Sequence, residues 1–126
     1  DRTVASEIGV FVRSVAQLER AKEALAVSRL QYSILDDRMV LKPDEATIST
    51  MHLAKGLEFR AIAVMACDDE VVPLQERIEN VADNADLEEV YDTERHLLYV
   101  ACTRARDHLL ITCTRPGSEF LDDLIK

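Results

Sequence analysis

The sequence predicts a single α/β domain built on a mostly parallel β-sheet with helices on both faces. Short apolar stretches suited to strands alternate with stretches of helical periodicity, which is the order of elements found around parallel sheets. Several strand candidates are apolar at nearly every position, as expected of strands that are buried on both faces. The 126 residues are enough for one domain with a hydrophobic core of its own.

The first half of the chain contains most of the predicted strands and one helix. Its strands are expected at residues 8–13, 32–35, 38–41 and 46–50. The segment 38–41 precedes Pro43 and therefore suits only a short edge strand. Between the first two strands, residues 15–27 have helical periodicity. The inward face of this helix is expected to consist of Val15, Leu18, Ala21 and Leu25.

The second half begins and ends with apolar strands, which are predicted at residues 61–66 and 108–114. Residues 71–86 predict a loop. Helical periodicity then extends from about Leu87 to Arg106, with an inward face of Val90, Leu97, Ala101 and Ala105. Pro116 and Gly117 end the last strand, and Ser118 is placed to cap a terminal helix.

The composition is that of an ordinary soluble domain, with 48% hydrophobic and 31% charged residues. No apolar run approaches the roughly 20 residues of a membrane span, and no signal-peptide pattern opens the chain. A cytoplasmic location without membrane contact is therefore expected. Cys67, Cys102 and Cys113 lie in apolar segments, which predicts buried, reduced thiols. The three histidines have no cysteine partners at zinc-ligand spacing, so no metal site is predicted.

The net charge of −9 is concentrated in one acidic segment, residues 68–94. This segment contains eleven acidic residues and one basic residue, so it carries −10 while the rest of the chain carries +1. Two interpretations stay open, a solvated loop and a docking surface for a basic domain. Because nucleic-acid affinity depends on clustered Lys and Arg, the isolated chain is expected to bind nucleic acid weakly.

Two dense motifs carry the chemistry. The first, Thr50-Met-His-Leu-Ala-Lys-Gly-Leu-Glu-Phe59, follows a predicted strand. The second, Glu94-Arg-His-Leu-Leu-Tyr-Val-Ala-Cys-Thr-Arg-Ala-Arg106, puts two arginines on one turn of a predicted helix. Ligands of parallel sheets bind outside the carboxyl ends of the strands, so both motifs are expected to reach that edge. On spacing alone, the two arginines also suit the solvent face of a helix.

Together these motifs resemble motifs V and VI of the UvrD/Rep-type superfamily 1 DNA helicases, and the likeness extends from Ile8 to about Thr114. The resemblance implies a three-layer P-loop NTPase fold of the RecA-like type and identifies residues 1–126 as a second RecA-like motor domain. The phosphate-loop half is lacking, since the sequence contains no G-x-x-x-x-G-K-[ST] pattern. We therefore expect a fragment of a longer chain, whose first RecA-like motor domain is the partner and holds most of the Mg²⁺ contacts.

The resemblance assigns four residues to ATP. Arg104 is expected to be the catalytic arginine finger at the γ-phosphate, a role suited to a planar, permanently charged guanidinium. Glu58 is expected near the ribose, with an ion pair to Arg60 or Arg95 as the alternative. Gly56 permits a tight backbone path, and Arg95 is expected to support the nucleotide side.

The resemblance also implies contacts with single-stranded DNA. Thr50, His52 and Lys55 are expected to face the strand. Arg13 lies in a short Arg-Ser-x-x-Gln element after the first strand and is a candidate for a contact with the DNA backbone. A purely structural strand-to-helix junction is the alternative for Arg13. Arg106 is expected to be a surface or ion-pairing residue.

The function implied by the family is that of the C-terminal motor domain of an ATP-dependent DNA helicase or translocase, inactive as a separate fragment. Two other classes stay open: a non-catalytic, helicase-derived protein-interaction module, and an ATPase that remodels protein–DNA complexes without unwinding. In many relatives a large helical insertion precedes the first motif. Here only residues 36–45 could hold it, so a compact variant is expected.

Overall fold

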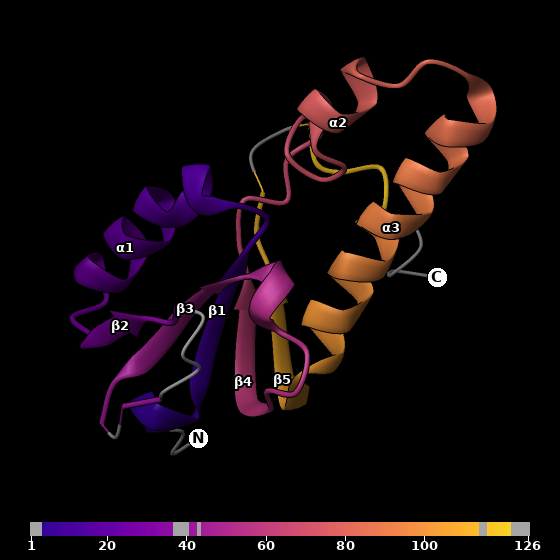
Figure 1. Ribbon diagram of the computed structural model, residues 1–126. Coiled ribbons are helices and arrows are strands. Elements are labelled where there is room, and N and C mark those ends of the chain that lie inside the picture. Colours follow the sequence, from indigo (N-terminus) through magenta and orange to yellow (C-terminus); the bar gives the residue numbers. More distant parts are fainter. Residues whose placement is uncertain (1–3, 37–40, 43, 114–115, 122–126) are drawn as a thin grey trace.

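The computed structural model of the protein describes residues 4–36, 41–42, 44–113 and 116–121. At its centre is a five-stranded sheet with the strand order β2-β3-β1-β4-β5 (Figure 1). All four strand pairings are parallel. The strands are β1 (Ile8–Val12), β2 (Tyr32–Ile34), β3 (Ala46–Thr50), β4 (Phe59–Val64) and β5 (Ala105–Ile111). The predicted α/β class with a mostly parallel sheet is confirmed.

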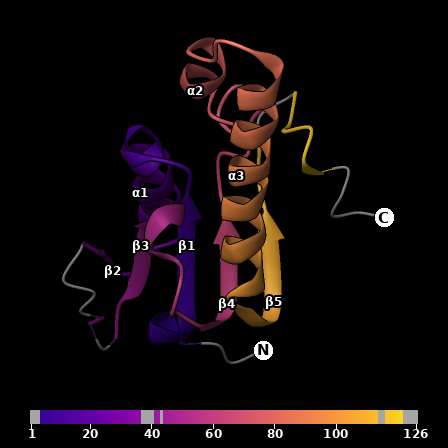
Figure 2. The same ribbon diagram turned by 45° about the vertical axis from the view of Figure 1, so that its right-hand side comes forward.

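Helices lie on both faces of this sheet and complete three layers. Helix α1 (Leu18–Val27) packs on β1 and β3, whereas the 20-residue α3 (Asn84–Thr103) runs along β4 and β5 (Figure 2). A short helix α2 (Gln75–Glu79) precedes α3. Three 3₁₀ turns complete the described elements: η1 (Ala5–Glu7), η2 (Val15–Gln17) and η3 (Met51–Leu53).

The hydrophobic core is divided by the sheet into two clusters. The cluster beneath α1 contains Val10, Val12, Ala21, Leu25, Ala46 and Ile48. The larger cluster beneath α3 includes Phe11, Met51, Phe59, Ile62, Val64, Leu98 and Ala101. Along β1, and along β4 from Ile62 onward, successive residues enter opposite clusters, because successive side chains of a strand point to opposite faces. The helix α3 and the turn η3 therefore share one face of the sheet.

Several predicted boundaries differ from the structure. Val15, expected inside, is 72% exposed, because residues 15–17 form a 3₁₀ turn and the α-helix begins only at Leu18. Helix α3 starts three residues earlier than expected, because Asp83 caps it: its carboxylate accepts a hydrogen bond from Asp86 N–H at 2.9 Å. The predicted loop 71–86 contains the helix α2.

The end of α3 is the main correction to the predicted elements. The helix ends at Thr103, and Ala105 already pairs with Phe59 in the sheet. The carbonyl of Arg104 accepts a hydrogen bond from Phe59 N–H at 2.9 Å, so sheet pairing replaces the next helical turn. Arg104 is thus the C-terminal cap of α3, and Arg106 lies on β5 rather than on the same helical turn.

Two predicted elements lie mostly outside the described residues. Most of the edge strand predicted at 38–41 lies outside the described residues, as does most of the terminal helix predicted after Ser118. Ser118 does act as a local cap, because its hydroxyl accepts a hydrogen bond from Phe120 N–H at 3.2 Å. Of the three thiols expected to be buried, Cys67 and Cys102 are buried but Cys113 is exposed.

The coverage of the sheet is incomplete at its edge. Leu110 on β5 is in register with Ala63, which packs in the cluster beneath α1. Leu110 is nevertheless 60% exposed, because α1 covers β1 and β3 and does not extend to β5. No helix in the described part of the chain is long and apolar enough to cross a membrane.

Candidate functional site

Arg104 is held at the carboxyl end of α3. Its Nε donates to the carbonyl of Val100 at 3.1 Å, and its Nη2 donates to Thr103 Oγ1 at 3.2 Å. The last carbonyls of a helix carry partial negative charge, which favours a cation at this position. These contacts keep the guanidinium of Arg104 close to the helix end while the side chain stays partly accessible.

Glu58 lies beside this helix end, because it directly precedes β4, the strand that starts opposite Arg104. Its carboxylate is 3.6 Å from Nε of Arg106, and the two side chains are 68% and 52% exposed. The alternative predicted for Glu58 was an ion pair with Arg60 or Arg95; the ion pair found in the structure is with Arg106. Arg60 instead donates to Asp107 at 2.9 Å. The carboxylate of Glu58 is therefore exposed to solvent near the end of α3 that carries Arg104.

Gly56 turns the chain between η3 and β4. Its φ of +86° is a conformation that only glycine adopts readily. A Cβ built on Gly56 would meet no atom within 4 Å, so the backbone conformation, not crowding, requires glycine here. The surface at Gly56 is open in the isolated chain.

The residues Gly56, Glu58 and Arg104 lie toward the amino ends of β4 and β5, not at the carboxyl edge where both motifs were expected. The reason is topological. Helix α3 runs antiparallel to the strands and leads directly into β5, so its last residue lies where β5 begins (Figure 1). A carboxyl-edge site requires residues that follow strands, and neither Glu58 nor Arg104 does.

The carboxyl edge instead carries the start of the first motif. Thr50 is the last residue of β3 and precedes η3, which contains the exposed His52. Lys55 is exposed in the turn that follows. Buried Met51 and Ala54 alternate with these polar side chains and pack in the cluster beneath α3. Residues 50–58 thus connect the two ends of the sheet along the face that α3 covers.

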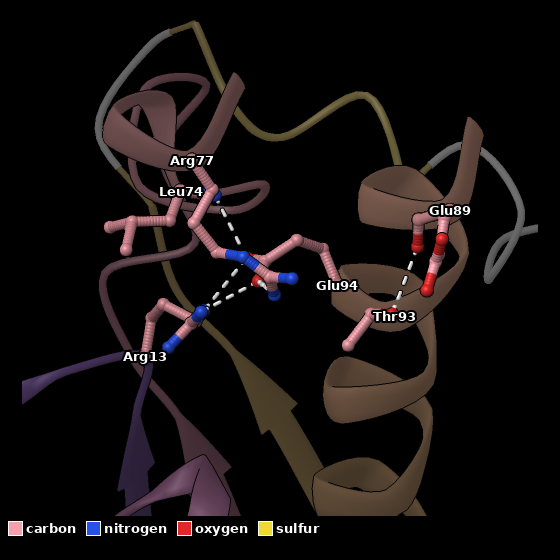
Figure 3. A network of polar contacts seen from close by, with 6 residues as sticks. All are labelled: Arg13, Leu74, Arg77, Glu89, Thr93 and Glu94. Carbon is pink, nitrogen blue, oxygen red and sulfur yellow. Dashed lines mark hydrogen bonds and ion pairs between the residues drawn. The ribbon is translucent and has the colours of Figure 1, made fainter. Parts of the chain in front are cut away.

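Arg13 does not reach the surface. It follows β1 and is only 3% exposed, and its guanidinium donates from Nε and Nη2 to the two oxygens of Glu94 at 2.7 and 2.6 Å (Figure 3). The candidate contact of Arg13 with a DNA backbone does not fit this burial. The geometry favours the alternative interpretation, a structural junction between strand and helix.

Glu94 is the centre of a buried polar cluster that the predicted sites did not include. Besides Arg13, it accepts hydrogen bonds from Leu74 N–H at 2.8 Å and from Nη1 of Arg77 at 2.7 Å, while its own exposure is 0% (Figure 3). Burial by itself would raise the pKa of the Glu94 carboxyl. The hydrogen bonds from Arg13, Leu74 and Arg77 outweigh burial and lower the pKa.

Arg95 is separated from the other nucleotide candidates. It lies nine residues before Arg104, on the opposite side of α3 given the helical repeat of about 3.6 residues. Its guanidinium stacks over the ring of Phe120 at 4.8 Å and donates to Asp92 at 3.3 Å. A shallow pocket of about 280 Å³ is lined there by Asp92, Arg95, His96 and Tyr99. Within the described residues, His, Cys, Asp and Glu side chains form no group of three or more that could hold a metal ion.

Comparison with known proteins assigns a family. Residues 6–116 match the family model described as UvrD-like helicase C-terminal domain. The chain is 38% identical over 80 residues to the ATP-dependent DNA helicase Rep of Buchnera aphidicola, which is 63% of this chain and 11% of that protein. It is 38% identical over 69 residues to the ATP-dependent DNA helicase PcrA of Bacillus subtilis, or 55% of this chain and 8% of that one.

A solved structure has the same fold. It is the C-terminal domain of a possible DNA helicase from Lactobacillus plantarum WCFS1, which superposes with a TM-score of 0.61 at 25% identity. The superposition covers 91% of this chain and 60% of that one. The curated relatives are far longer, since the chain spans between 8% and 11% of their length.

Proposed function

Because the chain belongs to the family of UvrD-like helicase C-terminal domains, we propose that it is the second motor domain of an ATP-dependent DNA helicase or translocase. Its task in that protein is to complete an ATP site formed mainly by a first motor domain and to hold single-stranded DNA. The observation that carries the proposal is that Glu58 and Arg104, although they come from separate motifs, lie at the same end of the sheet, where Phe59 N–H, next to Glu58, donates to the carbonyl of Arg104 at 2.9 Å.

The chemistry of the two side chains fits a nucleotide. Hydrolysis of a nucleoside triphosphate needs positive charge at the transferring phosphoryl group, set in position beforehand. Arg104 is suited to this role because Val100 and Thr103 restrain its guanidinium at a helix end. The exposed carboxylate of Glu58 is suited to accept a hydrogen bond from a ribose hydroxyl. ATP supplies the phosphoryl group, and the first motor domain holds the Mg²⁺.

The DNA-facing role falls to Thr50, His52 and Lys55. This assignment is supported by the exposure of His52 and Lys55 and by the position of Thr50 at the end of β3. A lysine suits a phosphate oxygen, and histidine and threonine side chains suit sugar and phosphate contacts. During the ATPase cycle the first motor domain would close onto Arg104 and then open again. Thr50, His52 and Lys55 would bind the single-stranded DNA alternately with the DNA-binding residues of the first domain.

The proposal is tested by replacing Arg104 with alanine in the complete protein. In Arg104→Ala, ATPase activity in saturating single-stranded DNA is expected to fall by on the order of 10³-fold or more, because an arginine finger contributes on the order of 10³–10⁵ to the rate. ATP binding, measured with a fluorescent nucleotide, is expected to persist.

Arg106→Ala is the matched comparison, since this second arginine lies two residues away on the exposed start of β5. Its effect on the rate is expected to be far smaller than that of Arg104→Ala. Equal losses in the two variants would mean that general positive charge, not a finger at position 104, supports hydrolysis. A complete protein without DNA-stimulated ATPase activity would end the motor proposal.

A further inference from the structure

Glu94 joins three separate elements through one buried carboxylate. Arg13 follows β1, Leu74 and Arg77 belong to the segment between β4 and α3, and Glu94 itself lies in the middle of α3 (Figure 3). Four hydrogen bonds of 2.6–2.8 Å reach its two oxygens. The side chain is therefore fully engaged and lies away from solvent.

A buried ion cluster of this kind contributes little net stability compared with well-packed apolar side chains of the same volume, because removing the charges from water is costly. Its geometry, however, is tightly specified, since a planar guanidinium and a carboxylate fit in one bidentate arrangement. We therefore attribute the role of Glu94 to the geometry that it imposes on α3, not to a gain in stability.

Helix α3 has no buried residue before Glu94. Its buried residues are Glu94, Leu98, Ala101 and Cys102, so Glu94 is the first of them along the helix. The later three pack against the sheet and the residues around η3. Arg104 follows at the helix end, ten residues or roughly 15 Å beyond Glu94. The carboxylate thus fixes the same rigid element that presents Arg104.

The cluster also reaches the edge that carries the DNA-facing residues. Val12, the last residue of β1, is in register with Thr50 on β3, and Arg13 is the next residue. Arg13 therefore directly follows the sheet partner of Thr50, and Glu94 holds its guanidinium. The pairing of β1 with β3, the peptide bond from Val12 to Arg13 and the hydrogen bonds from Arg13 to Glu94 thus connect the edge at Thr50 to α3.

We propose that Glu94 is a positioning residue that couples DNA at the Thr50 edge to hydrolysis at Arg104, by fixing α3 to the end of β1. This inference rests on the proposed function. In this proposal Glu94 contacts neither DNA nor nucleotide. It holds α3 in place relative to the end of β1, so that a shift at the Thr50 edge changes the position of Arg104. Loss of the carboxylate is expected to reduce the response of the ATPase to DNA.

The test is the ratio of ATPase rates with and without saturating oligo(dT), measured in the complete protein. In Glu94→Gln this ratio is expected to fall about tenfold, within the ~5–150-fold range typical of coupling between two sites. A merely structural loss would lower both rates by the same factor, because each is proportional to the folded fraction, and would leave the ratio unchanged. An unchanged ratio in Glu94→Gln overturns the inference.

Glu89→Gln is the matched control, because it removes the same charge from an exposed position on the same helix (Figure 3). It is expected to leave the ratio as in the wild type, and an equal fall in this control would also overturn the inference. If Glu94→Gln does not accumulate as folded protein, Glu94→Asp keeps the charge but shortens its reach. A smaller fall in the ratio is then expected, and none would overturn the inference.

Failure of the proposed function would look different. In that case the wild type shows no stimulation by DNA, or Arg104→Ala retains its rate, whatever the behaviour of Glu94 variants.

Discussion

The Glu94 carboxylate depends on its partners for its charge. Isolated in the core, a carboxylate would be driven toward its neutral form, because burial disfavours ionisation. Two arginines and a backbone N–H reverse that preference, so the pKa of Glu94 is lower in the folded chain than its ordinary value of 4.5. A group with a lowered pKa stabilises the fold above its ordinary pKa, and that stabilisation is lost as the pH falls toward the lowered value.

Replacing Glu94 with glutamine should therefore have a pH-dependent cost. At pH 7, Glu94→Gln is expected to lower the free energy of unfolding by about 3–5 kcal/mol, because Arg13 and Arg77 lose their buried anion. Below about pH 4.5 the difference between wild type and variant should shrink, because the wild-type carboxyl becomes protonated. Urea denaturation followed by circular dichroism, repeated from pH 7 to about pH 3, measures the difference.

The control for this prediction is Glu89→Gln, at an exposed position on the same helix. Its effect should stay within about 0.5 kcal/mol at pH 7, as for most surface substitutions. A gap between wild type and Glu94→Gln that stayed constant on acidification would contradict the assignment of the lowered pKa.

The burial of Glu94 could be predicted from the sequence, but its partner could not. Glu94 lies four residues after Val90 and three before Leu97, on the predicted inward stripe of the helix. A charge on such a stripe indicates a buried partner. The identity of that partner could not be predicted, because Arg13 is 81 positions away and only the tertiary fold brings the two together. The burial of Arg13 could not be predicted either, for the same reason.

At the scale of elements, the cap at Asp83 sets where α3 begins. Replacing Asp83 with alanine removes the acceptor for Asp86 N–H and is expected to cost about 1 kcal/mol of stability. Asp83→Asn is the matched control, because asparagine caps a helix about as well as aspartate and should change little. The two variants are compared by urea denaturation. Equal stability of the alanine and asparagine variants would show that the cap contributes nothing.

The first three strands were predicted to within one residue, whereas the last strand, predicted at 108–114, spans Ala105–Ile111, a shift as large as that of α3. β3 was predicted at 46–50 and occupies those residues, because a β-branched run between turn residues has few alternatives. The end of α3 was placed too late, since Ala101 and Ala105 continue the helical spacing and no glycine or proline marks a stop. The pairing of Ala105 with Phe59, a long-range contact, ends the helix instead.

On the scale of the whole molecule, the candidate sites lie at two ends of one sheet. Arg104 and Glu58 are near the amino ends of β4 and β5, whereas Thr50 is at the carboxyl end of β3. The sequence predicted the sheet and the residues but placed all of them at one edge. That error arose because the order of elements along the chain does not specify where a helix ends relative to its strand.

The acidic segment lies mostly at the carboxyl-edge end of the molecule, in α2 and the first half of α3 (Figure 1). Because it is near the candidate DNA-facing edge, its charge should repel a nucleic-acid backbone. Replacing Glu76 and Glu79 of α2 by glutamine is expected to raise the affinity of the chain for single-stranded DNA several-fold in about 50 mM salt. The gain should fade near 1 M salt, where the screening length is only about 3 Å. Fluorescence anisotropy measures both affinities.

The position of the charge is tested by a second pair of substitutions. Glu19 and Glu23 lie on α1, across the sheet from α3 and η3, and their replacement by glutamine changes the net charge by the same amount. If only the α2 pair raises affinity, the acidic segment acts locally on the DNA-facing edge. Equal gains from both pairs would mean that overall charge alone limits binding, because long-range repulsion depends on net charge rather than on its place. The local effect is the expected one, since the rest of the chain carries +1 and the segment −10.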